Sequence, residues 1–137
     1  EAAADWRPAP GWRMRAGATF RVTSPFEAGA TLFPGLFASQ VPRRSANILS
    51  SWRLGNRTDA DLWVVRVGPR DVPGQAALPA STRLDLRLAR HLNRRVEVAL
   101  VGQNILDARH AEYVSFVPGF APVEVRRGLY GQIRISE

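Results

Sequence analysis

The sequence has no cysteine among its 137 residues. This absence excludes disulfide bonds, thiol catalysis, zinc ribbons and iron–sulfur clusters, but it leaves the cellular compartment open, because an oxidising compartment permits disulfides without requiring them. Long apolar runs are also missing. The longest are Leu62–Val65 and Val98–Val101, far short of the ~18 residues that a membrane-spanning helix needs. A helical membrane protein is therefore excluded.

Runs of charge are scarce as well. Charged residues make up 23% of the chain and hydrophobic residues 45%, a composition too apolar for a disordered chain and suited to one ordinary domain. The net charge is +7, yet the arginines behind it are spread along the chain instead of forming a basic tail. We therefore expect no nucleic acid among the partners. Because Glu1 comes first and no signal-peptide pattern lies near it, we expect a segment of a longer protein.

Apolar residues recur at every second position almost everywhere, which is the period of a β-strand and not of a helix. The clearest case is Trp12–Val22, where apolar residues alternate with arginine, glycine and threonine over the whole length. Such alternation gives each strand one wet and one dry face, and it predicts seven strands and no helix. The predicted strands are Ala2–Arg7, Trp12–Val22, Arg44–Leu54, Ala60–Val67, Thr82–Ala89, Arg95–Val101 and Leu129–Ser136.

The connections between these strands alternate strictly between short and long. The short ones, rich in turn-forming residues, are Pro8–Gly11, Gly55–Thr58 and Arg90–Arg94; the long ones are Thr23–Arg43, Gly68–Ser81 and Gly102–Glu124. Transmembrane β-barrels have short periplasmic turns and long extracellular loops, and strands of ~9–11 residues. The pattern therefore predicts an all-β fold, an antiparallel up-and-down meander that forms the last part of a large transmembrane β-barrel.

The two faces of the predicted strands fit a barrel wall. Trp6, Trp12 and Trp52 lie near short turns on the apolar face and are interpreted as an aromatic girdle at the membrane interface. Arg66 departs from the pattern, since it falls on the lipid side, and it is tolerable only near the outer rim. The opposite face is expected to line a watery lumen, with arginines paired to Asp5, Asp61 and other carboxylates of neighbouring strands. The residues predicted to face the lumen are Arg13, Arg15, Arg21, Arg53, Arg83, Asp85, Arg87, Arg95, Glu97 and Arg134.

Several segments together carry a resemblance to a known family. Leu78–Leu88, the Gly102-Gln103-Asn104-Ile105-Leu106-Asp107 motif after Glu97–Val101, the aromatic-containing Arg109–Tyr113 and the start of the last strand at Arg126–Gly131 resemble the C-terminal region of TonB-dependent outer-membrane receptors. That family ends on an aromatic residue recognised during barrel assembly. This chain departs from the pattern, because it ends Ile135-Ser136-Glu137.

The resemblance implies a barrel of 22 strands with an N-terminal plug, located in the outer membrane of a Gram-negative bacterium. Residues 1–137 are then the C-terminal segment of that barrel, without the plug and the earlier strands. The implied activity is uptake of a siderophore or other metal chelate, cobalamin or a similar nutrient. The implied partners are outer-membrane lipid and lipopolysaccharide, the plug domain of the same protein, the TonB complex and a small-molecule substrate. No cofactor and no enzymatic activity are expected.

Three sets of residues invite a functional interpretation. His110 could form a metal site with Asp107 and Glu112, but two ligands at irregular spacing favour loop packing, and the same holds for His91. Gln103 and Asn104 resemble catalytic polar groups, yet no orienting partner is apparent, so hydrogen bonds that shape the loop are favoured. The aromatic loop with Phe26, Phe33 and Phe37 could contact a ligand or fold on itself as a lid, and both interpretations stay open.

A second class of function is a soluble or surface-bound all-β module that recognises an acidic polymer, such as a polysaccharide, through its arginines. Such a module would have to cover the apolar face, which includes Phe20, Leu86 and Leu100, with a second layer, and no second layer is apparent. An enzyme is a distant third, because no serine, histidine and acid can be assembled into a triad.

Overall fold

The computed structural model describes residues 1–22, 41–71, 77–115 and 120–136, which contain nine strands and no helix. No helix in the described part is long and apolar enough to cross a membrane. The strands are β1 Ala2–Ala9, β2 Trp12–Phe20, β3 Arg44–Leu54, β4 Thr58–Val67, β5 Ser81–His91, β6 Val96–Gln103, β7 Arg109–Tyr113, β8 Val123–Arg126 and β9 Gly128–Ile135.

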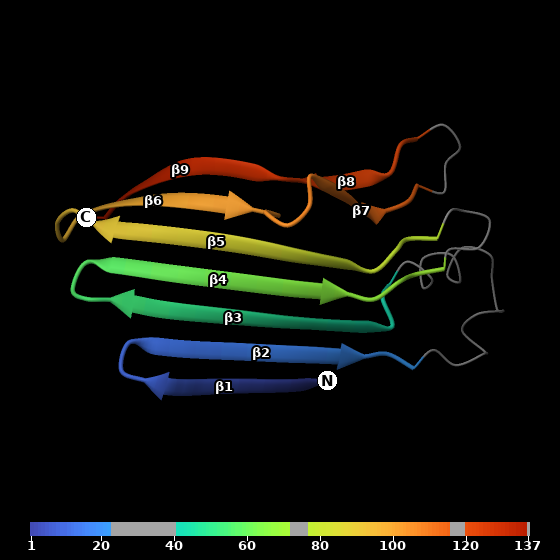
Figure 1. Ribbon diagram of the computed structural model, residues 1–137, viewed down its shortest axis with the longest axis horizontal. Helices are drawn as coiled ribbons and strands as arrows, with labels where there is room; N and C mark the ends of the chain where they lie inside the picture. The colour runs from blue at the N-terminus through green and yellow to red at the C-terminus, as the bar shows by residue number, and fades with distance from the viewer. Residues whose placement is uncertain (23–40, 72–76, 116–119, 137) are drawn as a thin grey trace.

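The predicted meander is confirmed. Seven strands form one antiparallel sheet in the order β1-β2-β3-β4-β5-β6-β9, so almost every strand pairs with its neighbour in the chain. Figure 1 shows this sheet as a single layer, with the tight turns after β1, β3 and β5 at one end and the ends of β2, β4 and β6 at the other. The turn between β3 and β4 depends on Gly55, whose φ of 72° suits glycine best.

The strand register places like residues beside like. Residues directly opposite each other share a face of the sheet, so the apolar positions of one strand meet those of the next. One row on the apolar face crosses the whole sheet, and one on the charged face crosses β2 to β6 and continues to Tyr130 on β9. The apolar row is Trp6, Met14, Ser50, Leu62, Leu86, Gly102 and Leu129, and the charged row is Arg13, Ser51, Asp61, Arg87 and Val101.

Burial is reversed relative to a soluble sheet. Apolar side chains on the apolar face are open, with Leu88 53%, Leu100 54% and Ile133 71% exposed. On the charged face, by contrast, Ala89 and Glu97 are buried. The hydrophobic cluster in the described residues is small: Leu78 and Val114 with Ala111 against them, outside the seven-stranded sheet. Nothing in the described part of the chain covers the apolar face.

Several details of the predicted strands were wrong: β1 extends to Ala9, β2 ends at Phe20 and not at Val22, and β5 extends to His91. The segment Gly102–Glu124, predicted to be a plain loop, contains β7 and the start of β8, which pair as a two-stranded sheet of their own. Strands this short show too few alternating positions to be seen as a period. Arg95, predicted to begin a strand, lies in the turn before β6, where its backbone N–H donates to Asn93 Oδ1 at 2.8 Å.

Candidate functional site

The charged face of the sheet is a ladder of arginine–carboxylate pairs. Within the ladder, Arg87 on β5 joins three strands: its Nη1 lies 3.1 Å from Asp61 Oδ2 on β4, and its Nη2 lies 2.5 Å from Glu97 Oε1 on β6. At the β1–β2 edge, Arg13 pairs with Asp5. The alternation places these charges on one face, and the strand register decides which of them pair: Asp61 stands directly opposite Arg87, whereas Asp5 and Glu97 are reached diagonally.

Several of the arginines named in the sequence lie beside carboxylates on this face, across two strands at Arg53 and within one strand at Arg83. Arg53 Nε lies 3.6 Å from Asp59 Oδ1, Arg83 Nη2 lies 2.6 Å from Asp85 Oδ2, and Arg134 stands opposite Glu97 in the register. Arg15 stands opposite Asp5. Arg21 lies one residue beyond the end of β2, and its backbone N–H donates to the Arg43 carbonyl at 2.8 Å.

A second polar cluster lies toward the end with the long connections. Asp85 accepts two interactions there: a bidentate contact from Arg83 and a 2.9 Å hydrogen bond from the backbone N–H of Asn104 to its Oδ1. The Arg83 guanidinium also lies 5.7 Å from the centre of the Trp63 ring, a cation–π contact between neighbouring strands. This cluster fixes the connection after β6 to the sheet.

The Gly102–Asp107 motif begins at the end of β6, and the structure explains why asparagine stands at 104 and glycine at 102. Asn104 is fully buried at a φ of 48°, a left-handed conformation that asparagine tolerates better than most residues, and its Nδ2 donates to the Val125 carbonyl at 3.1 Å. A side chain on Gly102 would come within 3.0 Å of Ile105 Cγ2. The loop-shaping interpretation of Asn104 therefore agrees with its hydrogen bonds, whereas Asp107 makes none with it in the described structure.

The three tryptophans predicted to form a girdle lie together on the apolar face. The ring centres of Trp6 and Trp12 are 6.2 Å apart, and those of Trp12 and Trp52 are 6.3 Å apart in a stacked arrangement. Trp12 Nε1 donates to Ser50 Oγ at 2.9 Å, so the indole nitrogen keeps a partner on an otherwise apolar face. The cluster lies beside the β1–β2 turn.

Two arginines on the apolar face mark its limits. Arg66, the exception noted in the sequence, lies next to the last residue of β4, and its Nη1 donates to Thr82 Oγ1 at 2.6 Å. Arg90 lies at the opposite end of the same face, next to the last residue of β5, and its Nη1 donates to Thr58 Oγ1 at 3.3 Å. Between these pairs, β4 and β5 present only alanine, leucine and valine on this face. Arg66 therefore lies near the end of its strand and not in its middle.

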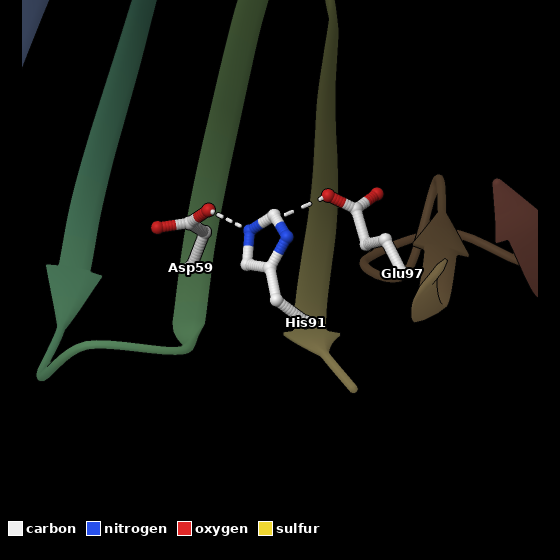
Figure 2. A group of neighbouring side chains, drawn as sticks. All are labelled: Asp59, His91 and Glu97. Atoms are coloured by element: carbon white, nitrogen blue, oxygen red, sulfur yellow. Dashed lines mark hydrogen bonds and ion pairs between the residues drawn. The ribbon is translucent and has the colours of Figure 1, made fainter. Parts of the chain in front are cut away.

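The two histidines differ in their surroundings. His110 on β7 has one carboxylate beside it, with Nε2 3.3 Å from Glu112 Oε1. His91 at the end of β5 lies between two, Asp59 and Glu97, as Figure 2 shows. Sequence reasoning considered ligands around His110 because it searched nearby in the chain, whereas in the described residues the group of three possible ligands is at His91. The signal for His91 was the tight turn after it, which places Glu97 directly opposite.

Some predicted site residues cannot be placed. Phe26, Phe33 and Phe37, the candidate ligand-contacting loop, lie outside the described residues. Gln103 ends β6 and stands opposite Gly128 in the register.

Comparison of the chain with protein-family models, curated proteins and solved structures gives no match.

Proposed function

We propose that this chain is part of a transmembrane β-barrel in the outer membrane of a Gram-negative bacterium, and that the barrel is a TonB-dependent receptor for uptake of a scarce nutrient such as a metal chelate. In this role the apolar face contacts lipid and the charged face lines the lumen. The chain then contributes to transport and not to catalysis. The plug domain and the contact with the TonB complex belong to parts of the protein outside this chain.

The reversed burial of the two faces carries the proposal. In water, a sheet buries its apolar face, because each exposed leucine or isoleucine forgoes ~1.5–3 kcal/mol of transfer free energy. Here Leu88 on β5, Leu100 on β6 and Ile133 on β9 are more than half exposed, while Leu84, Val96 and Val98 on the same face are partly exposed. The opposite face holds paired charges, which would each cost ~2–4 kcal/mol at the middle of a bilayer. A lipid phase outside and water inside satisfies both faces.

The dimensions of the apolar face support the same reading. Thr58 and Arg66, the polar residues at its two limits on β4, are eight positions apart, which at ~3.4 Å per residue is ~27 Å along the strand. A tilt of ~40° reduces this to ~21 Å, close to the ~25 Å apolar band of outer-membrane barrels. The tight turns at one end and the long connections at the other add the loop asymmetry of that class.

The uptake function rests on the resemblance of the Gly102–Asp107 motif, of Arg109–Tyr113 and of Arg126–Gly131 to the receptor family. The contacts of Asn104 support the resemblance indirectly, because they give this residue of the motif a structural role. Its hydrogen bonds hold the connection after β6 to Asp85 and Val125. The long connections at that end are where a receptor would collect its substrate.

The alternative, recognition of an acidic polymer, is less well supported. Arginines that bind an external polyanion have to be free to do so, whereas Arg13, Arg83 and Arg87 are each paired with a carboxylate of the same sheet. Their charge is already compensated, so the face offers a mixed and nearly neutral surface. Recognition of an acidic polymer also leaves the exposed apolar face unexplained.

Arginine substitution on each face of β9 tests the proposal. Leu129 is 74% exposed on the apolar face, and Gln132 is exposed on the charged face of the same strand. In the full-length protein, we expect Leu129→Arg to reduce sharply the folded protein recovered in the outer-membrane fraction, because the arginine would face lipid at a cost of ~2–4 kcal/mol. Gln132→Arg, the matched control, should assemble normally because it faces water.

A soluble sheet gives the opposite result. If the chain faces water on both sides, a leucine that is already 74% exposed can become arginine at little cost. Equal recovery of both variants, together with release of the protein in a soluble fraction, would overturn the membrane proposal. Uptake is tested separately by comparing ⁵⁵Fe-siderophore accumulation in cells with and without the gene, and with and without TonB.

A further inference from the structure

The Asp59–His91–Glu97 group lies at the tight-turn end of the charged face (Figure 2). His91 Nε2 lies 2.8 Å from Asp59 Oδ2 and 3.6 Å from Glu97 Oε2. The ligand atoms of the three residues all lie within 4.8 Å of one another. Three adjacent strands, β4, β5 and β6, thus bring one nitrogen and two carboxylates into one small group.

Each carboxylate of the group is oriented by an arginine through its other oxygen. Arg53 Nε lies 3.6 Å from Asp59 Oδ1, and Arg87 Nη2 lies 2.5 Å from Glu97 Oε1. The oxygens that remain, Asp59 Oδ2 and Glu97 Oε2, are the ones that face His91. Such outer contacts fix the direction of metal-binding carboxylates in known sites. The Glu97 side chain is also only 10% exposed, so its position is held by packing as well.

The chemistry at His91 Nε2 calls for a positive group between the two carboxylates. Nε2 faces the Asp59 carboxylate, and the Glu97 carboxylate lies on the other side of the imidazole ring (Figure 2). A neutral Nε2–H can donate to only one of them, and Asp59 is the nearer. A cation bound by all three atoms satisfies the nitrogen and both oxygens at once.

We propose that Asp59, His91 and Glu97 bind a divalent transition-metal ion, with Zn²⁺ as the best fit and water in the remaining position. Zinc accepts mixed histidine and carboxylate ligands at ~2.0–2.1 Å, whereas Mg²⁺ and Ca²⁺ prefer oxygen ligands alone. Ligand atoms around a tetrahedral zinc ion lie ~3.3 Å apart. The His91 contacts of 2.8 and 3.6 Å lie on either side of this value, and all three ligand atoms lie within 4.8 Å of one another, so binding requires the imidazole and the carboxylates to rotate toward a common point.

The ion would tie three strands together at one end of the sheet. It would stand on the side opposite Trp12 and Trp52, on the face that the proposed function assigns to the lumen. The site itself depends only on the register of β4, β5 and β6. Arg53 and Arg87 reduce the local negative charge, so we expect weaker binding than at a structural zinc site made of thiolates.

The experiment uses the full-length protein, purified in detergent, stripped with a chelator and titrated with Zn²⁺ by calorimetry and with Co²⁺ by visible absorption. We expect one Zn²⁺ site that His91→Ala and Glu97→Gln each weaken at least about a hundredfold, since even outer contacts of metal sites contribute 10–100-fold. The Co²⁺ absorption bands should disappear in the same two variants. Asp59→Asn provides a third variant if either of these fails to fold.

His110→Ala is the matched control. Its Nε2 lies near a single carboxylate, Glu112, so its removal should leave Zn²⁺ affinity within about twofold of the wild type. Unchanged binding in folded His91→Ala protein, or an equal loss in His110→Ala, would overturn the site. Neither result bears on the membrane proposal, which the β9 variants test on the other face of the sheet.

Discussion

The backbone N–H of Asn104 donates to Asp85 Oδ1 at 2.9 Å, across 19 residues of sequence. This bond joins the connection after β6 to the middle of β5, and the Asn104 side chain continues the link to Val125. The residue is fully buried. A single asparagine therefore holds the long connection against the sheet.

Replacing this asparagine tests the link. Asn104→Ala removes the donor to the Val125 carbonyl and places alanine at a φ of 48°, so we expect a loss of about 1–3 kcal/mol in the free energy of unfolding. Urea titration of the detergent-folded protein, followed by tryptophan fluorescence, measures it. Asn56→Ala in the exposed β3–β4 turn is the control and should change stability by less than about 0.5 kcal/mol. Equal effects of the two would mean that the buried contacts contribute nothing.

Arg87 should be more important for stability than other arginines of the charged face. Its guanidinium joins Asp61 and Glu97, and Arg87→Gln leaves the largely buried Glu97 carboxylate without that partner. We expect Arg87→Gln to lower the free energy of unfolding by about 1–3 kcal/mol. Arg15→Gln is the comparison, because no ion pair of Arg15 occurs in the described residues, and its effect should be close to zero. A larger loss of stability for Arg15→Gln than for Arg87→Gln would contradict the ladder of arginine–carboxylate pairs.

The cost of an arginine on the apolar face should depend on its position along β4. Leu62 lies midway between Thr58 and Arg66, and Ala60 and Val64 lie to either side of it. We expect Leu62→Arg to lower the free energy of unfolding most, by up to ~2–4 kcal/mol, and so to reduce the folded fraction most. Ala60→Arg and Val64→Arg should cause smaller losses, because the cost of a lipid-facing arginine falls toward the membrane interfaces. Gel mobility of unheated and heated samples gives the folded fraction. A flat profile would indicate that no lipid layer is centred on this strand.

The two ends of the sheet should differ in their access from outside the cell. Asp107 is exposed in the connection after β6, whereas Asn56 and Asn93 lie in tight turns at the other end. In intact cells, a membrane-impermeant maleimide should label Asp107→Cys and leave Asn56→Cys and Asn93→Cys unlabelled until the outer membrane is opened. Equal labelling of all three in intact cells would refute the assignment of tight turns to the periplasm.

The sheet was predictable from the sequence to the extent that its strands are long. Nine residues of unbroken alternation from Trp12 to Phe20 leave one choice of period and one choice of faces. The five residues of β7 and the four of β8 offer no comparable signal, and their pairing depends on contacts with Leu78 and Asn104 that only the folded chain supplies.

The clusters were harder to predict than the faces, for a physical reason. A charged position alternating along a strand is a local property, so the arginines of the charged face could be named in advance. The partners of Arg87 and His91 depend on which residues stand opposite, and the register of β4, β5 and β6 is set by turn geometry and packing. Only His91 and Glu97, at the two sides of one tight turn, were within reach of sequence reasoning.

The alternation of tight turns and long connections also sets an order for folding. Closing a connection ten times longer costs about 2 kcal/mol more in chain entropy, so the hairpins β1–β2, β3–β4 and β5–β6 should form before they join one another. The connection between β6 and β9 includes the β7–β8 hairpin, so β9 should pair with β6 late. The sheet is therefore expected to grow by docking of three preformed hairpins, with its C-terminal strand as the last to pair.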